Sequence, residues 1–320
     1  MTGRGMHTNN VFIVGYSRSG TKLLCNLIEQ GSDGDCEHVG ELHYFGRLRK
    51  DKELIKYHKK ELIIRKLIQQ YSRRKNFPFL DKEKLVAECI SDATKLTSND
   101  DVLQSTIDTI ARLRQINTIC DGTPRNIYYL DEILNTFPKA KIIYMLRDPR
   151  DCIASQKIKH IKALENNDAL ESSRLQTNYN PAIMSLFWKS SLNCYKQFSK
   201  DPRVFAIKYE ELLAEPKDTL ENLSDFLGYP DICKNWDQIK SNNRGKFKNV
   251  LNSTEISAIE FSTSAQLLSE YEITNPRHKL VSFIPFLGYL IKFLILFPSV
   301  YFKNRSRFQS LSHEAAKRLK

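Results

Sequence analysis

The sequence predicts an α/β fold in which a central parallel sheet carries helices on both faces, with helical insertions. Residues 11–14, VFIV, form an apolar run typical of a buried strand, and after Gly20 apolar residues return at helical spacing. The same order of strand and helix recurs in residues 117–137 and 140–156, and a further strand, VFAIKYE, occupies residues 204–210. Repeated pairs of this kind are typical of parallel sheets covered on both sides.

The length and composition limit the classes of protein. A chain of 320 residues with 41% apolar residues suits one large α/β domain with helical additions, or two domains at most. A net charge of +12 favours anionic ligands or surfaces. The seven cysteines are scattered, so we expect reduced, packed thiols of a cytoplasmic protein and no metal site. The first ten residues lack an apolar run, and we expect no signal peptide or N-terminal anchor.

The first turn, between the strand at 11–14 and the following helix, has the composition of a phosphate site. Such a turn directs backbone N–H groups and the positive end of a helix at one point, and it contains a cation and several hydroxyls. The expected contact residues are Tyr16, Ser17, Arg18, Ser19, Gly20, Thr21 and Lys22.

The order of these residues argues against a nucleotide-hydrolysing P-loop. That loop ends in Gly-Lys followed by Ser or Thr, with the hydroxyl on Mg²⁺. Here Thr21 precedes Lys22, so the two groups are transposed. An ordinary strand–turn–helix with an incidental arginine is the plain alternative.

A second polar turn follows the predicted strand at 142–146. Arg147 ends that strand, Asp148 is expected to cap the next helix, and Ser155 lies two turns along it. Because ligands bind beyond the carboxyl ends of parallel strands, we expect this turn, the first turn, Glu41 and Asp121 to converge.

These motifs resemble those of one enzyme family. GYSRSGTKLL, beginning at residue 15, resembles the 5′-phosphosulfate loop of sulfotransferases that use 3′-phosphoadenosine 5′-phosphosulfate (PAPS), and RDPRDCIAS, beginning at Arg147, resembles their 3′-phosphate element. The stretches around CDGTPR and VFAIKYEELL resemble the bacterial and carbohydrate-type branch, and the resemblance spans about residues 11–228. It implies the P-loop NTPase-like sulfotransferase fold.

The resemblance also implies an activity and a set of roles. The expected reaction is in-line transfer of a sulfuryl group from PAPS to an acceptor hydroxyl or amine, without a metal. Arg18 would stabilise the leaving phosphate, and Arg147 with Ser155 would hold the 3′-phosphate. Glu41, in GELHYF, would be the catalytic base, with His43 as the second candidate.

Two further positions bear on this comparison. Arg244, in NNRGKFKN, lies in a segment that faintly resembles the loop over the 3′-phosphate in cytosolic sulfotransferases, although a solvated loop is the plainer interpretation. Related sequences often have Lys-Thr-Pro where this chain has Gly122-Thr123-Pro124, so a lysine near the sulfate is missing, and Arg18 or Lys22 could compensate.

The remaining segments are less informative. Residues 47–75 predict a basic amphipathic helix, which we interpret as a solvated face and not as a nucleic-acid site. Residues 81–116 predict helix, residues 157–181 a polar loop, and residues 229–275 no clear pattern.

The C-terminal part is strongly apolar and flanked by cations. Residues 280–302 are long enough to span a bilayer, but both flanks are basic and two prolines are expected to break the helix near its ends. We therefore expect a segment that contacts a membrane surface, with a true span or a protein-buried hairpin as alternatives. The expected division is a sulfotransferase domain at 1–275 and a membrane-associated segment at 276–320, peripheral or monotopic on the cytoplasmic face.

The remaining partner is the molecule that accepts the sulfuryl group. A glycan or glycolipid hydroxyl is the expected class, and no nucleic acid is expected. A P-loop kinase or NTPase and a non-catalytic membrane-surface protein are the competing functions.

Overall fold

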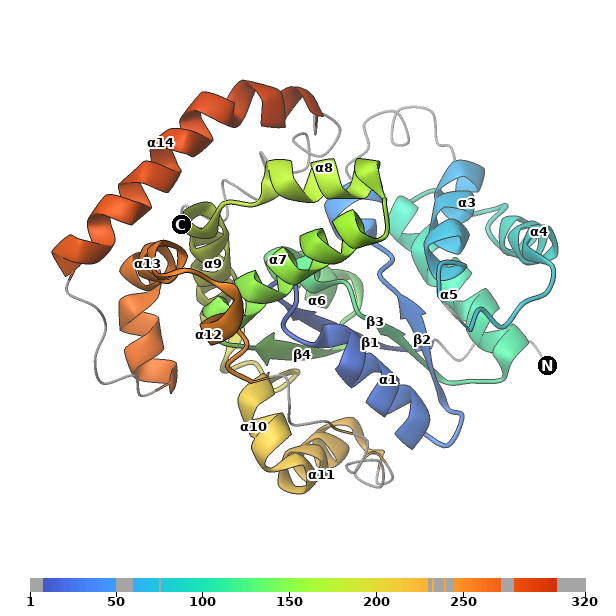
Figure 1. Cartoon of the computed structure of the whole chain (residues 1–320). Coiled ribbons are helices and arrows are strands. Elements are labelled where there is room, and N and C mark those ends of the chain that lie inside the picture. Colours follow the sequence, from blue (N-terminus) through green and yellow to red (C-terminus); the bar gives the residue numbers. More distant parts are fainter. Residues whose placement is uncertain are drawn as a thin grey trace.

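The computed structural model of the chain describes residues 8–49, 60–74, 76–229, 232, 239, 244–271 and 279–303. Five parallel strands form one sheet in the order β2-β3-β1-β4-β5 (Figure 1). The strands are β1 (Asn9–Gly15), β2 (Cys36–Gly40), β3 (Thr118–Asp121), β4 (Lys141–Leu146) and β5 (Val204–Lys208). The parallel sheet confirms the predicted fold class.

Helices occupy most of the remaining described chain. They are α1 (Thr21–Gly31), α3 (Lys60–Tyr71), α4 (Lys82–Asp92), α5 (Asn99–Arg114), α6 (Leu130–Thr136), α7 (Pro149–Glu165), α8 (Ala169–Asn178), α9 (Pro181–Phe198), α10 (Tyr209–Ala214), α11 (Pro216–Leu227), α12 (Phe247–Val250), α13 (Ser253–Tyr271) and α14 (Lys279–Lys303), with a π-helical turn η1 (Tyr44–Leu48) and a 3₁₀ helix η2 (Pro124–Tyr129).

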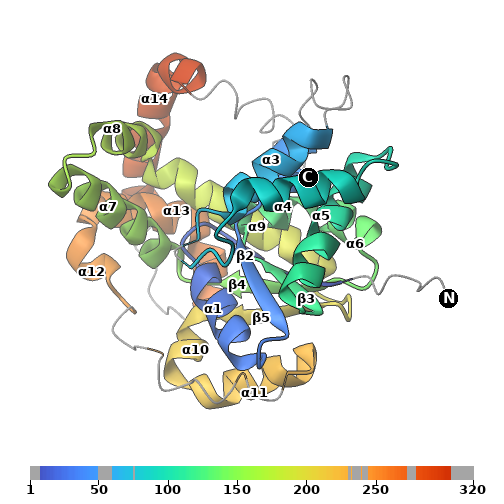
Figure 2. The same ribbon diagram turned by 90° about the vertical axis from the view of Figure 1, so that its right-hand side faces the viewer.

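The sheet is buried on both faces, as the apolar runs predict. On β1, Val11 and Ile13 pack into a cluster with α1, α10 and α11, whereas Phe12 and Val14 pack on the other face with helices that include α3, α5 and α9. Figure 2 shows α11 below the sheet and α3 and α9 above it. Side chains alternate between the faces along each strand, so a continuous apolar run satisfies both layers.

The strand order fixes where a ligand can bind. From β1 the chain crosses α1 to reach β2 on one side of the sheet, whereas β4 and β5 lie on the other side. The connections therefore change direction between β1 and β4, where Gly15 pairs with Met145. Crevices at such a change of direction, beyond the carboxyl ends of the strands, are the usual ligand sites of α/β sheets.

The prediction of a polar loop over residues 157–181 is wrong. The helix α7 continues to Glu165, and α8 follows with Asp168 as its cap, since the Asp168 carboxylate accepts the N–H of Glu171 at 3.0 Å. Glu171 also pairs with Lys159 and Arg174. Ion pairs and a cap stabilise α8 and the largely exposed second half of α7, where polar residues conceal the helical pattern.

The expectation of no pattern over residues 229–275 is also wrong for α13. Asn252 accepts the N–H of Glu255 at 2.9 Å, and the Glu255 carboxylate accepts the N–H of Asn252 at 2.8 Å. This reciprocal arrangement is a capping box. Its signal, Asn-Ser-Thr-Glu, is present in the sequence.

Two other predicted helical stretches are confirmed in part. The stretch 81–116 forms two helices, α4 and α5, because Ser98 caps the second by accepting the N–H of Asp101. Within the basic stretch 47–75, residues 60–71 form α3, and residues 50–59 and 75 lie outside the described residues.

The prediction that two prolines break the C-terminal helix is wrong, because α14 runs through both Pro285 and Pro298. Near Pro285 the rings of Phe283 and Phe286 pack on Phe261 of α13, which supports the turn that lacks a backbone hydrogen bond. Among the described residues, no helix has both the length and the apolar character needed to cross a membrane.

The cysteines of the described residues behave as small apolar side chains. Six are buried and form no disulfide: Cys25, Cys36, Cys89, Cys120, Cys152 and Cys194. The seventh, Cys233, lies outside the described residues.

Candidate functional site

The turn after β1 is shaped by two glycines. A Cβ on Gly15 would lie 2.6 Å from the carbonyl oxygen of Met145, so the backbone of β4 leaves no room for a side chain. Gly20 has φ 105°, and a Cβ there would lie 2.7 Å from the ring of Tyr209. Only glycine fits both positions without strain.

The residues between these glycines form a compact loop ahead of α1. Ser19 is fully buried, and its hydroxyl donates to the carbonyl of Tyr16 at 2.5 Å. Arg18 adopts φ 74° and is exposed, whereas Thr21 is buried at the first position of α1. Since Gly20 has no side chain to cap α1, the N–H groups of its first turn face the loop.

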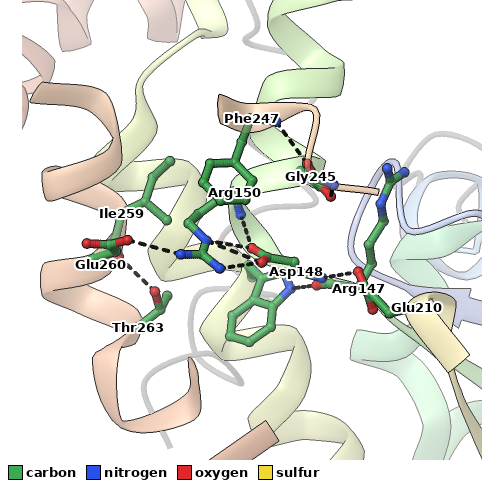
Figure 3. Close-up of polar contacts among 11 residues, drawn as sticks. Arg147, Asp148, Arg150, Glu210, Gly245, Phe247, Ile259, Glu260 and Thr263 are labelled. Carbon is green, nitrogen blue, oxygen red and sulfur yellow. Dashed lines mark hydrogen bonds and ion pairs between the residues drawn. The ribbon is translucent and has the colours of Figure 1, made fainter. Parts of the chain in front are cut away.

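Arg147 reaches this loop from the end of β4. Its Nη1 donates to the carbonyl of Arg18 at 3.0 Å, and its guanidinium lies 4.2 Å from the ring centroid of Tyr209. The indole of Trp188 donates to the Arg147 carbonyl at 2.8 Å (Figure 3). The buried arginine is therefore fixed at both its backbone and its side chain.

The two predicted phosphate elements meet directly. The Nε of Arg18 donates to the hydroxyl of Ser155 at 3.0 Å, across 137 positions of sequence. The loop and the turn after β4 thus form one polar surface containing two arginines and a serine. Tyr209 belongs to the same surface but was not predicted, although its place directly after β5 was an available signal.

A buried charge network holds the turn between β4 and α7. Asp148 caps α7 and pairs with Arg150, whose Nη1 reaches Glu260 of α13 at 3.1 Å (Figure 3). Glu210 accepts the N–H of Asp148 at 3.0 Å, and burial raises the pKa of Glu210. These partners immobilise the residue that follows Arg147.

The segment with Arg244 is attached to the same helix end. The carboxylate of Asp151 accepts the N–H of Gly245 at 2.7 Å and that of Phe247 at 3.0 Å. The guanidinium of Arg150 lies 4.2 Å from the ring centroid of Phe247. The side chain of Arg244 is exposed. Because the neighbouring N–H of Gly245 is bonded to Asp151, the backbone at Arg244 lies close to the first turn of α7.

Glu41 and His43 form a second polar cluster at the end of β2. The Oε2 of Glu41 lies 3.3 Å from the Nε2 of His43, and the two side chains are 52% and 19% exposed. His43 adopts φ 54°, a backbone conformation that few residues other than glycine occupy. A carboxylate that is open to solvent and touches an imidazole can accept a proton from a bound molecule.

Asp121, at the end of β3, supports this cluster. Its Oδ1 accepts the N–H of Thr123 at 2.8 Å and the hydroxyl of Thr123 at 2.6 Å, with a longer 3.5 Å contact from the N–H of Leu42. The Thr123 hydroxyl in turn accepts the N–H of His43 at 3.2 Å. Burial raises the pKa of Asp121, and the bonds from Thr123 oppose that rise.

The space at Gly122 is already filled. A Cβ there would lie 2.7 Å from the Sγ of Cys25 and 3.4 Å from the Nε2 of His38. Burial, Arg74 and then Lys22 lower the pKa of His38 to about 3, so the charge of Lys22 acts on this side of α1. A lysine at 122 would need these neighbours to move.

Comparisons with known proteins identify the family of the chain. The sequence model described as "Sulfotransferase family" matches residues 10–232. Curated relatives include Cytosolic sulfotransferase 1 of Arabidopsis thaliana, 26% identical over 28% of this chain and 28% of that protein, and Cytosolic sulfotransferase 3 of the same plant, 23% identical over 42% of this chain and 43% of that protein. The chain therefore aligns with less than half of each relative.

A solved structure shares the fold over most of the chain. The Sulfotransferase Domain from the Synechococcus PCC 7002 Olefin Synthase superposes with a TM-score of 0.57 and 19% identity, covering 86% of this chain and 99% of that domain. The likeness extends the common architecture beyond the matched residues 10–232. By the family match, which covers more than half of its length, the chain belongs to the Sulfotransferase family.

Proposed function

We propose that this protein transfers a sulfuryl group from PAPS to a hydroxyl or amine of an acceptor. The observation that carries the proposal is the 3.0 Å contact between Arg18 and Ser155, which joins the loop after β1 to the turn after β4. PAPS has a phosphosulfate at its 5′ position and a phosphate at its 3′ position, and both groups are anionic. A surface with two arginines beside a helix N-terminus complements these two groups.

The nucleotide is held by the residues that the motifs indicate. The N–H group of Gly20, with Thr21 and Arg18, binds the 5′-phosphosulfate. The Ser19 N–H donates to the Tyr16 carbonyl at 3.1 Å and joins them once it turns from that carbonyl to the ligand. Tyr16, Ser17 and Lys22 complete the surroundings of that loop. This assignment is supported by the buried, hydrogen-bonded loop and the uncapped start of α1.

The 3′-phosphate is bound by a separate set of groups. Arg147 and Ser155 bind it, and the exposed side chain of Arg244 closes over it. The rigid placement of Arg147 against Tyr209 supports the first of these roles, and the anchor of Gly245 on Asp151 supports the last.

The chemical step is an in-line displacement at sulfur. The acceptor hydroxyl gives its proton to the Glu41 carboxylate, its oxygen forms a bond to sulfur, and the bond between sulfur and the 5′-phosphate oxygen breaks. Arg18 and the N–H groups of the loop stabilise the charge that develops on the released phosphate. His43, 3.3 Å from Glu41, orients the carboxylate and is the alternative base. No metal has a role in this proposal, because arginine meets the charge of one phosphate.

The acceptor in this proposal is a glycan or glycolipid, and the reaction takes place in the cytoplasm. The half-exposed Glu41 is suited to a bulky acceptor that approaches from solvent. The competing kinase or NTPase function lacks support from the loop, in which Thr21 and Lys22 are transposed, and the family match favours the sulfotransferase.

A ligand-binding experiment tests the proposal. Thermal unfolding is measured with adenosine 3′,5′-bisphosphate, with adenosine 5′-phosphate, and with ATP and Mg²⁺. A ligand present at 100 times its Kd stabilises a protein by about 2.7 kcal/mol, so we expect a clear rise in Tm with the bisphosphate only. A larger rise with ATP and Mg²⁺ would support the kinase, and no rise with any nucleotide would support the non-catalytic alternative.

A further inference from the structure

We propose that α14 is a docking helix that lies in the plane of an anionic lipid surface, and the first basis for this is its composition. Fifteen of the residues 280–302 are Leu, Ile, Val or Phe. The helix nevertheless belongs to a protein whose sheet is already covered on both faces, so it is not needed to close the core. Figure 1 shows α14 along the edge of the molecule, outside α13 and α9.

One side of α14 is fixed to the body of the protein. The rings of Phe283 and Phe286 lie 5.4 and 4.8 Å from the ring of Phe261 in α13. Asn180, the cap of α9, donates its side-chain amide to the carbonyl of Tyr289 at 2.8 Å. These contacts orient the helix, so the opposite side has a defined direction.

The opposite side is an apolar stripe open to solvent. Ile284, Leu287, Ile291 and Leu294 follow one another at spacings of three or four residues, and each is exposed. Ile284, Leu294 and Ile295 are 73%, 62% and 72% exposed. Contiguous exposed apolar residues of this kind mark an interaction surface.

The charge pattern around the stripe identifies the partner. Between Ile273 and His313 the sequence has no Asp or Glu, and its Lys and Arg residues are Arg277, Lys279, Lys292, Lys303, Arg305 and Arg307. An apolar helix with cations at both ends and near its middle complements a layer of anionic headgroups above acyl chains. Because both ends have the same sign of charge, both prefer the same side of a bilayer, which favours a helix in the plane.

A second copy of the chain is a poorer partner for this stripe. In a symmetric contact, the same surface patch faces itself. Pairing two α14 helices would bring the basic ends and Lys292 of each close to the cations of the other, on a protein of net charge +12. A lipid surface provides the opposite charge instead.

The docking helix also lies near the candidate site. The hydroxyl of Tyr179, the residue before Asn180, donates to the Glu255 carboxylate at 2.8 Å, and Lys157 of α7 donates to the same carboxylate at 2.8 Å. Because Lys157 lies two residues after Ser155, a short chain of contacts joins α14 to the helix that contains Ser155. In this proposal the protein is peripheral on the cytoplasmic face, and docking through α14 brings this end of the molecule to the lipid surface. Residues 276–320 are then a docking segment, separate in role from the domain at 1–275.

Vesicle sedimentation with the full chain tests the proposal. The vesicles are phosphatidylcholine alone, or phosphatidylcholine with about one third phosphatidylserine. We expect at least tenfold stronger binding to the anionic vesicles, falling as salt rises. The variant Leu294→Glu with Ile295→Glu changes two exposed residues and should lose at least tenfold of this binding.

The matched control is Leu80→Glu with Leu113→Glu, which adds the same charge at exposed leucines in the region of α4 and α5. This control should bind the anionic vesicles as strongly as the unchanged protein does. The Tm shift with adenosine 3′,5′-bisphosphate is recorded for every variant, and we expect it to be equal, so that loss of docking is separated from loss of nucleotide binding. Three results would overturn the proposal: no preference for anionic vesicles, equal binding by both double variants, or a dimer in light scattering that Leu294→Glu with Ile295→Glu dissolves.

Discussion

The two sides of the candidate site differ in how firmly the protein holds them. On the nucleotide side, at the ends of β1 and β4, Ser19 and Arg147 are buried and bonded to backbone carbonyls. On the acceptor side, at the ends of β2 and β3, Glu41 is about half exposed and contacts His43 at 3.3 Å. A site for a fixed pair of phosphates benefits from being preformed, whereas a base must leave room for the molecule it deprotonates.

The largest expected effect tests the acceptor side. We predict that Glu41→Gln lowers kcat by about 10²- to 10⁴-fold, because the amide cannot accept the acceptor's proton, while affinity for adenosine 3′,5′-bisphosphate stays unchanged. Sulfate release from PAPS serves as a surrogate assay before the acceptor is known.

His43→Ala is the companion variant for this comparison. A smaller loss of kcat than for Glu41→Gln is expected, since the imidazole only contacts the carboxylate in this proposal. If His43→Ala abolishes turnover and Glu41→Gln does not, the two roles must be exchanged.

The next effect tests the nucleotide side. Arg147→Ala should weaken adenosine 3′,5′-bisphosphate at least tenfold, because a charge-assisted hydrogen bond contributes about 1.5–3 kcal/mol. Adenosine 5′-phosphosulfate, which lacks the 3′-phosphate, should lose little affinity, and calorimetric titration measures both. The control Arg203→Ala removes an arginine whose partner is Asp201 and should leave both affinities intact. Equal losses for the two ligands with Arg147→Ala would contradict the assignment.

A third prediction concerns how tightly the nucleotide loop is packed. Gly20→Ala places a Cβ 2.7 Å from the Tyr209 ring at φ 105°, whereas Gly228→Ala places one at φ 80° with no heavy atom within 4 Å. Both substitutions carry the left-handed backbone penalty of about 1–2 kcal/mol, so their difference isolates the clash. We expect Gly20→Ala to lower the free energy of unfolding by at least a further 1 kcal/mol in urea titrations. Equal values for the two variants would mean that the loop is not tightly packed.

The last prediction is a pH dependence of stability beneath the acceptor side. Burial lowers the pKa of His38 to about 3, from an unfolded value near 6.5, so the unfolded chain binds the extra proton below pH 6.5. Stability must therefore fall as pH decreases from about 6.5 towards 3, and between pH 7 and pH 5 this amounts to about 2 kcal/mol.

His38→Gln removes that group and should flatten the slope of unfolding free energy against pH by about that amount. An unchanged slope in His38→Gln would show that other groups govern acid unfolding.

Local patterns predicted a large part of this fold. The apolar run at 11–14, the glycines of the first turn and the Asp-Pro start of α7 each act over a few residues, and the structure confirms all three. Polar helices were missed where composition hides them: α8 is stabilised by Asp168 and by ion pairs of Glu171, and the capping box at Asn252 starts α13.

The sequence by itself determined which residues stand at strand ends, because burial of a parallel strand requires an apolar run and a phosphate turn requires small residues and N–H groups. Only the tertiary structure decided that Arg18 meets Ser155, that Asp151 anchors the backbone at Gly245, and that Gly122 has no room for a side chain. Each of these contacts joins segments about 80 or more residues apart, or depends on neighbours packed from another strand or helix. Side-chain contacts at such separations depend on how whole elements pack, which no local pattern specifies.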